Sequence, residues 1–160
     1  MTFTTSPNER RRSRPPDRPP FQGDAARAQA TMAAFAREAT MPLDYLDFDY
    51  SEDDEGTASW DALASVAAER LPALTAEVEQ LLHWASRTFA GRRGPIEEGG
   101  DWDYDLHAQQ DDGQPLAIEF DTGSGRLQHA AATGQRIELG LTLSASAAFS
   151  EALRRRYKID

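Results

Sequence analysis

The chain of 160 residues contains no cysteine and only one lysine, Lys158. The missing cysteines exclude disulfide bonds, thiolate nucleophiles and cysteine-ligated zinc. A cysteine-free chain fits a reducing compartment, so we expect a cytoplasmic location. No stretch approaches about eighteen consecutive apolar residues, and the sequence therefore predicts no transmembrane helix. No glycine-rich phosphate loop follows a predicted strand, and we expect no cofactor.

Basic residues are also scarce in the middle of the chain, although the formal net charge of the whole is only −10. Residues 41–121 hold twenty Asp and Glu against four Arg, which gives 4 − 20 = −16. Residues 1–20 hold five Arg against two acids, which gives 5 − 2 = +3. A core this negative repels nucleic acid and anionic membranes, so the charge favours a basic protein as partner.

Composition divides the chain into three parts. Residues 1–23 are rich in proline and arginine and poor in apolar side chains, which predicts a disordered basic tail. Residues 24–40 are rich in alanine and predict a weak helix or a linker. Residues 41–160 are expected to form a single α+β domain. The abundance of Ala and Arg is typical of a GC-rich bacterial genome, and Met32 and Met41 are alternatives to Met1 as the translation start.

Apolar residues recur with the period of strands or of helices over most of residues 41–160. The best helix is expected over Glu69–Phe89, with Glu77 and Glu79 facing solvent. A last helix is expected to begin at Ser144 or Ser146. Alternating patterns predict the strands, listed in chain order: Pro42–Tyr50 with a bulge near Tyr45, Thr57–Val66, Asp101–Gln109, Leu116–Asp121, a short continuation over Arg126–Ala130, and Arg136–Leu143.

This order, (α)-β-β-α-β-β-β-α, predicts an α+β fold. We expect a single antiparallel sheet of about five strands, with the two main helices packed on one face. Asp111, Asp112 and Gly113 form a strong hairpin signal between the strands ending at Gln109 and beginning at Leu116. The face without helices is expected to be open and acidic.

Acidic residues occupy every second position in three of the predicted strands. Side chains alternate across a strand, so these carboxylates should share the face opposite their aromatic and aliphatic neighbours. We therefore predict a non-enzymatic acidic binding protein, of the inhibitor, immunity, chaperone or adaptor kind, that engages a basic protein through this face. The predicted partner-binding residues are Asp47, Asp49, Asp101, Asp103, Asp105, Glu119 and Asp121.

The alternative is a small divalent-metal hydrolase that uses the same carboxylates. Carboxylates two residues apart on a strand lie about 7 Å apart, and His107 is in phase with Asp105. Asp103 and Glu119 could form a catalytic pair if their strands were neighbours. The resemblance of residues 101–112 to a calcium loop fails at Leu106, where the loop needs glycine. We expect no metal site and no catalytic residue.

Overall fold

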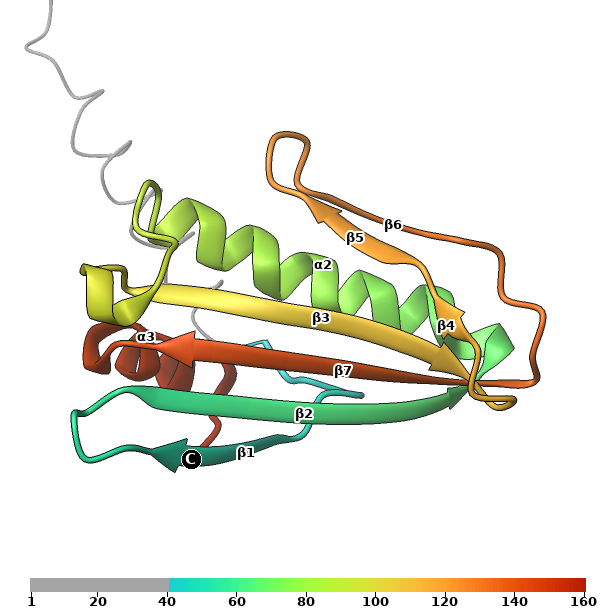
Figure 1. The fold of residues 1–160 in the computed structure, drawn as a ribbon, viewed down its shortest axis with the longest axis horizontal. Coiled ribbons are helices and arrows are strands. Elements are labelled where there is room, and N and C mark those ends of the chain that lie inside the picture. Colours follow the sequence, from blue (N-terminus) through green and yellow to red (C-terminus); the bar gives the residue numbers. More distant parts are fainter. Residues whose placement is uncertain (1–40) are drawn as a thin grey trace, which may run out of the picture. The chain divides into compact units, whose positions relative to one another are not determined.

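The computed structural model of the protein describes residues 41–160 and confirms the α+β fold. The predictions for residues 1–23 and 24–40 lie outside the described residues. A main sheet of five strands, a two-stranded hairpin and two α-helices make up the described part (Figure 1). Its elements are β1 (Phe48–Glu52), β2 (Ala58–Ala67), η1 (Ala68–Arg70), α2 (Leu71–Thr88), η2 (Ile96–Glu98), β3 (Trp102–Gln110), β4 (Pro115–Leu116), β5 (Ile118–Asp121), β6 (Arg126–His129), β7 (Arg136–Ala145) and α3 (Ala147–Tyr157).

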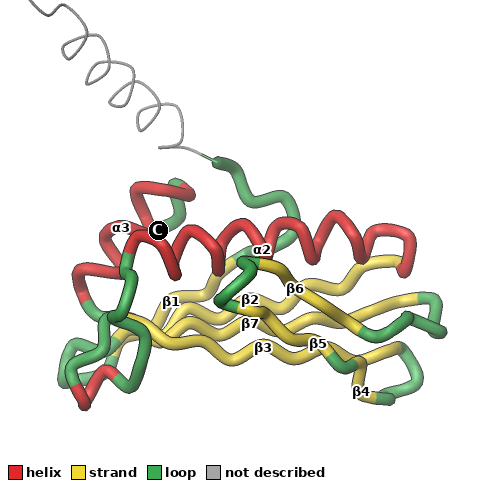
Figure 2. Tube along the Cα trace, turned by 90° about the horizontal axis from the view of Figure 1, so that it is seen from above, coloured by secondary structure: helices red, strands yellow, loops and turns green. Residues whose placement is uncertain are grey.

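The main sheet is antiparallel throughout, with the strand order β1-β2-β7-β3-β4. The last strand in sequence, β7, lies at the centre, where Leu143 is opposite Trp60 on one side and Tyr104 on the other. Its odd-numbered positions from Ile137 to Ala145 are apolar and fully buried. Both helices pack on this buried face of the sheet. Figure 2 shows the helices in one layer and the strands in another.

The core lies between the sheet and the two helices. Helix α2 buries an apolar stripe at helical spacing, and α3 adds Phe149, Leu153 and Tyr157. The ring of Phe149 stacks on Trp102, with centroids 5.5 Å apart and planes 8° apart. Burying one such large side chain stabilises the fold by about 1.5–3 kcal/mol, so these contacts hold the helices on the sheet.

Both helices begin where the local sequence favours a start. Residues Ala68–Arg70 form a 3-10 turn, and α2 then begins at Leu71 with Pro72 in its first turn, where a missing N–H costs nothing. Ser146 is the N-cap of α3, because its Oγ accepts a hydrogen bond from the Phe149 N–H at 3.2 Å. Neither helix in the described part is long and apolar enough to span a membrane.

The first strand is shorter than predicted and starts later. Residues Asp44, Tyr45 and Leu46 are not in a strand, because their N–H groups donate to the carboxylate of Glu77 on α2, at 2.7–3.0 Å. No bulge near Tyr45 is needed, since strand pairing begins only at Phe48. Glu77, expected to face solvent, instead anchors this segment to the helix.

The predicted strand Leu116–Asp121 is two strands in different sheets. Strand β4 adds only two pairs to the edge of β3, with Leu116 opposite Ala108. The chain then leaves the main sheet, and β5 pairs with β6 in a separate hairpin. The hairpin lies against α2, where Glu79 accepts a hydrogen bond from the Leu127 N–H at 2.8 Å. Glu79, also expected to face solvent, thereby holds the hairpin over the side of the core.

Candidate partner-binding face

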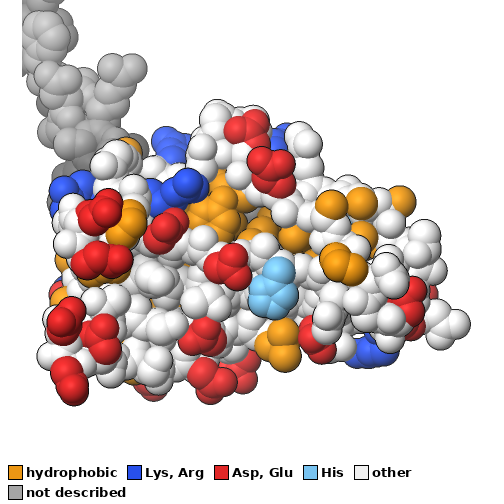
Figure 3. Space-filling model, viewed as in Figure 1, with side chains coloured by type: hydrophobic (Ala, Val, Ile, Leu, Met, Phe, Trp, Pro, Cys, Tyr) orange, Lys and Arg blue, Asp and Glu red, His pale blue; other side chains and the backbone are white. Residues whose placement is uncertain are grey.

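The face of the main sheet opposite the helices is not covered by any described element, and we call it the open face (Figure 3). Strand alternation sends the small, polar and acidic residues of β1, β2, β7 and β3 to this side. Carboxylates are spread across the strands in Figure 3, with few basic side chains among them. The open face is formed by Asp49, Ser51, Ser59, Asp61, Leu63, Ser65, Glu138, Gly140, Thr142, Ser144, Asp103, Asp105, His107 and Gln109.

One transverse row of the open face carries three aspartates. Asp49 of β1 lies opposite Asp61 of β2. Thr142 of β7 lies opposite Asp61 on one side and opposite Asp105 of β3 on the other. Neighbouring strands are about 4.8 Å apart, so the row crosses the sheet within about 15 Å. No basic side chain belongs to this row. Opposed like charges destabilise an antiparallel pair, so the row concentrates negative charge at a cost to stability.

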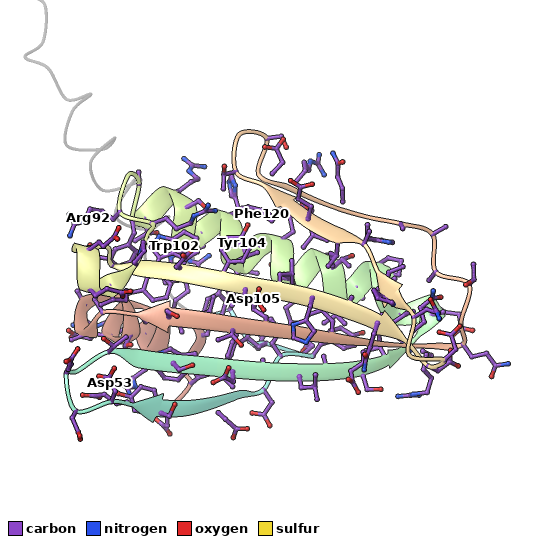
Figure 4. All side chains as sticks on the ribbon, in the orientation of Figure 1. Asp53, Arg92, Trp102, Tyr104, Asp105 and Phe120 are labelled. Carbon is purple, nitrogen blue, oxygen red and sulfur yellow. The ribbon has the colours of Figure 1, made fainter. Side chains whose placement is uncertain are left out.

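Hydroxyl groups fix the middle aspartate of the row. Asp61 accepts hydrogen bonds from Thr142 Oγ1 at 2.7 Å and from Ser59 Oγ at 2.8 Å. The carboxylate is thus oriented before any partner arrives, which reduces the entropy lost on binding. Asp105, at the end of the row, keeps 81% of its side chain exposed. Figure 4 shows it on β3, at the open face.

The next row brings an apolar residue and a histidine onto the same face. Leu63 is 63% exposed and lies opposite Gly140, which lies opposite His107. A Cβ on Gly140 would come within 2.4 Å of His107 Nε2, so only glycine lets the imidazole lie over β7. His107 Nδ1 is 3.6 Å from Asp105 Oδ2. The open face therefore has an exposed leucine beside its acidic row.

Three of the seven predicted site residues lie together on the open face: Asp49, Asp103 and Asp105. Asp47 is exposed but precedes β1, so no pairing fixes its position. Asp103 is partly neutralised, because Arg93 Nε is 3.7 Å from its Oδ1. The predicted alternation is correct in β1 and β3, and it fails for the residues outside these strands.

Asp101 is not among the strand residues that form the open face, because it precedes β3, and its carboxylate has partners of its own. Arg92 Nε donates to its carboxylate at 2.6 Å, and Ser146 Oγ donates at 3.0 Å. The hydrogen bond from Arg92 holds the pKa of Asp101 below its ordinary value, against a smaller opposing effect of desolvation. This carboxylate connects the loop before β3 to the start of α3.

Glu119 and Asp121 are not on the open face either, because β5 has left the main sheet. Asp121 shapes the turn after β5 by accepting hydrogen bonds from Ser124 Oγ at 2.7 Å and from the Gly123 N–H at 2.9 Å. The hydrogen bond from Ser124, followed by that from Gly123, lowers the pKa of Asp121. The proposed pairing of Asp103 with Glu119 as strand neighbours is therefore wrong.

Sequence reasoning omitted two residues that the structure places in the centre of the face. Alternation along β2 puts Asp61 on the polar side of that strand, but its polar neighbours there are serines, so the pattern gives no sign of a row of carboxylates. Leu63 breaks the polar alternation of β2, and that irregularity was the available signal. Both belong to the face only because β2 pairs with β1 and β7 in this register.

The carboxylates do not converge into a metal site in the described part of the chain. Among residues 41–160, no group of three or more His, Asp or Glu side chains could hold a metal ion. The row is a line of charges across a flat sheet, whereas a metal needs several oxygen ligands around one point.

Comparisons of the chain with protein-family models, with curated proteins and with solved structures found no match. The functional argument therefore rests on the chemistry of the open face.

Proposed function

We propose that the protein is a non-enzymatic binding protein whose open face engages a basic protein partner. The observation that carries this proposal is the row formed by Asp49, Asp61 and Asp105, with Thr142 between the last two. A row of like charges that contains no basic side chain lowers the stability of the free protein, and a basic partner would reverse that cost. Acidic faces of this kind suit inhibitors, immunity proteins, chaperones and adaptors of basic proteins.

The row and the leucine beside it would contribute differently to binding. Exposed carboxylates raise the association rate by electrostatic steering, which weakens as salt screens the charges. Leu63 supplies an apolar anchor next to the row, and small apolar centres ringed by polar groups carry much of the affinity of protein interfaces. The same negative charge disfavours nucleic acid and anionic membranes as partners. We place the protein in the cytoplasm because the chain has no cysteine.

The test compares the full-length protein with an Asp49→Asn/Asp61→Asn/Asp105→Asn variant. Binding to a small basic protein, cytochrome c, is measured by biolayer interferometry at low and at high salt. We expect the variant to bind at least about tenfold more weakly at low salt, because three steering charges are removed from the interface. The difference should shrink at high salt, where the charges of both proteins are screened.

A matched variant separates the open face from net charge. Glu55→Gln/Glu97→Gln/Glu98→Gln, which we call the loop control, also removes three charges and leaves the open face intact. Glu55 is exposed in the turn after β1, and Glu97 and Glu98 are exposed in the short 3-10 helix η2. We expect this control to lose less than about threefold in affinity. If both variants lose affinity equally, the protein attracts cations through net charge alone and the proposal is wrong.

A further inference from the structure

The main sheet lacks part of a strand beside β3. With Leu116 opposite Ala108, a continuous strand would place Ile118 opposite Leu106 and Phe120 opposite Tyr104. Instead the chain leaves the ladder at Ala117, and β5 pairs with β6. No strand of residues 41–160 takes the position beside β3 that a continued β4 would have taken, and we call this position the vacated lane.

The lane exposes backbone hydrogen-bonding groups. Within an antiparallel strand, successive residues direct their N–H and C=O to alternate sides. The Trp102 carbonyl accepts from the Gly94 N–H and the Gln110 N–H donates to the Gln114 carbonyl, each at 2.9 Å and away from β7. Tyr104 and Leu106 are in phase with these residues, so their backbone groups also point into the lane.

Of the lane-facing N–H and C=O groups of Tyr104 and Leu106, only one has a partner in residues 41–160. The Tyr104 N–H donates to the side chain of its own neighbour, Asp103 Oδ1, at 2.9 Å. The N–H and C=O of Leu106 and the C=O of Tyr104 have no partner among the described residues. An exposed strand edge of this kind is a template for a further strand.

A cleft of about 240 Å³ occupies the vacated lane between β3 and β5. Two aromatic residues are among its lining, Tyr104 and Phe120, whose rings meet edge to face with centroids 6.3 Å apart. Both residues are labelled in Figure 4. Asp103, Asp105 and Glu119 line the cleft against one cation, Arg93, which lies 5.2 Å from the centre of the Tyr104 ring. The lining has a net negative charge, and apolar surface is visible between the hairpin and the sheet in Figure 3.

We propose that the vacated lane binds a short extended segment of the basic partner, which adds to β3 as a strand antiparallel to it. The segment residue opposite Leu106 would exchange two main-chain hydrogen bonds with it and point an apolar side chain toward Ile118 and Phe120. The residues on either side would lie opposite Asp105 and His107 and point to the open face, where the Asp105 carboxylate, 3.6 Å from His107 Nδ1, favours Arg or Lys. The lane thus fits the pattern basic–apolar–basic.

Charge argues for this occupant over a second copy of the chain. The other free edge of the sheet, β1, carries Asp49 and Glu52, and two chains of net charge −10 repel each other. The lane is also short, because Gly94 bonds to one end of β3 and β4 to the other. It therefore suits a few residues of a foreign chain better than a long strand pairing.

The inference rests on the proposed function, and its test uses a defined peptide, acetyl-Gly-Arg-Ile-Arg-Gly-amide, with the full-length protein. Nuclear magnetic resonance at low salt follows amide hydrogen exchange with and without the peptide. We expect exchange of the Leu106 amide to slow by at least about tenfold at saturation, because its N–H acquires a strand partner. Amides of β1, at the opposite edge, should keep their exchange rates.

Two N-methylated peptides provide the matched control. Methylation at the central Ile removes the N–H that would bond to Leu106 and should weaken affinity roughly five- to tenfold, the effect of about one hydrogen bond. Methylation at the second Arg removes an N–H that points away from β3 and should change affinity less than about twofold.

The possible failures differ for the two proposals. If the peptide does not bind, or binds without protecting Leu106, or if both methylated peptides bind equally well, strand addition is overturned. The proposed function survives that result if the Asp49/Asp61/Asp105 variant still loses its affinity for cytochrome c relative to the loop control. If that variant loses nothing, the open face is not the binding surface, whatever the peptide does in the lane.

Discussion

The two faces of the main sheet come from the same strands but have opposite roles. Along β2, the residues that face the helices include Trp60 and Ala62, which are at most 5% exposed. Their neighbours on the open face include Asp61 and Leu63, which are both exposed. The covered face therefore supplies stability, whereas the open face is free to carry charge that the fold does not need.

The largest expected effect comes from substituting one leucine on each face, which tests whether only the covered face stabilises the fold. Leu143→Ala removes a fully buried side chain from the central strand β7, and we expect a loss of about 3 kcal/mol in unfolding free energy. Leu63→Ala makes the same chemical change on the open face, where the side chain is 63% exposed, and should cost less than about 1 kcal/mol. Urea unfolding followed by circular dichroism measures both.

The same pair of variants has a second readout in cytochrome c binding. Leu63→Ala should weaken binding although the protein remains stable, whereas Leu143→Ala should leave the affinity of the folded fraction unchanged. A large stability loss in Leu63→Ala would mean that the open face contributes to folding after all.

The helices that pack on the covered face include a buried titrating group, Tyr157 of α3, which predicts a stability change at high pH. Tyr157 is 6% exposed and packs against Trp84, with ring centroids 5.7 Å apart. Burial raises the pKa of Tyr157 to about 12 from an ordinary 10.0, against a smaller opposing effect of Arg156. Between these two values the unfolded chain releases the proton and the folded chain keeps it, so stability falls as pH rises.

A shift of about two units corresponds to at most about 2.7 kcal/mol, fully lost only near pH 12. Tyr157→Phe should remove this contribution, so we expect the wild type to lose more stability than the variant between pH 10 and pH 12. Urea unfolding at several pH values provides the comparison. Parallel pH curves for the two proteins would show that Tyr157 ionises in the folded state as freely as in the unfolded chain.

The fold class could be predicted because most of its signals are local. Alternation along β2, β3 and β7 and the apolar stripe of α2 are visible in the sequence, and the structure confirms them. The two errors came from contacts between distant residues. Glu77 binds the backbone of residues 44–46, and the hairpin β5–β6 docks on α2 through Glu79. No local pattern reveals such partners.

For the candidate site, the sequence predicts which residues of one strand share a face, and no more than that. Alternation correctly placed Asp49, Asp103 and Asp105 on one face. Phase alone does not show which strands are neighbours, and Glu119 left the face when β5 left the sheet. The row with Asp61 depends on pairing across β1, β2, β7 and β3, and the vacated lane depends on a break within one apparent strand. Both depend on which residues of different strands are paired, and no local sequence pattern gives that pairing.

The smallest expected effect tests whether the aspartates of the open face lower the stability of the fold. Asp49 lies directly opposite Asp61, and opposed like charges in a strand pair cost about 0.2–1 kcal/mol. Asp49→Asn keeps the shape of the side chain and removes the repulsion, so we expect a gain of about 0.5 kcal/mol at low salt. The gain should shrink at high salt, where the repulsion is screened.

Binding should respond in the opposite direction, because the same substitution removes a charge from the row. Glu55→Gln, in the turn after β1, changes net charge equally without altering a directly opposed pair, and serves as the control. Urea unfolding and cytochrome c affinity are measured for the wild type, Asp49→Asn and Glu55→Gln. A variant that binds more weakly and unfolds at higher urea shows that Asp49 is kept for its partner and not for the fold. If Asp49→Asn is destabilised at low salt, the row is part of what holds the sheet together.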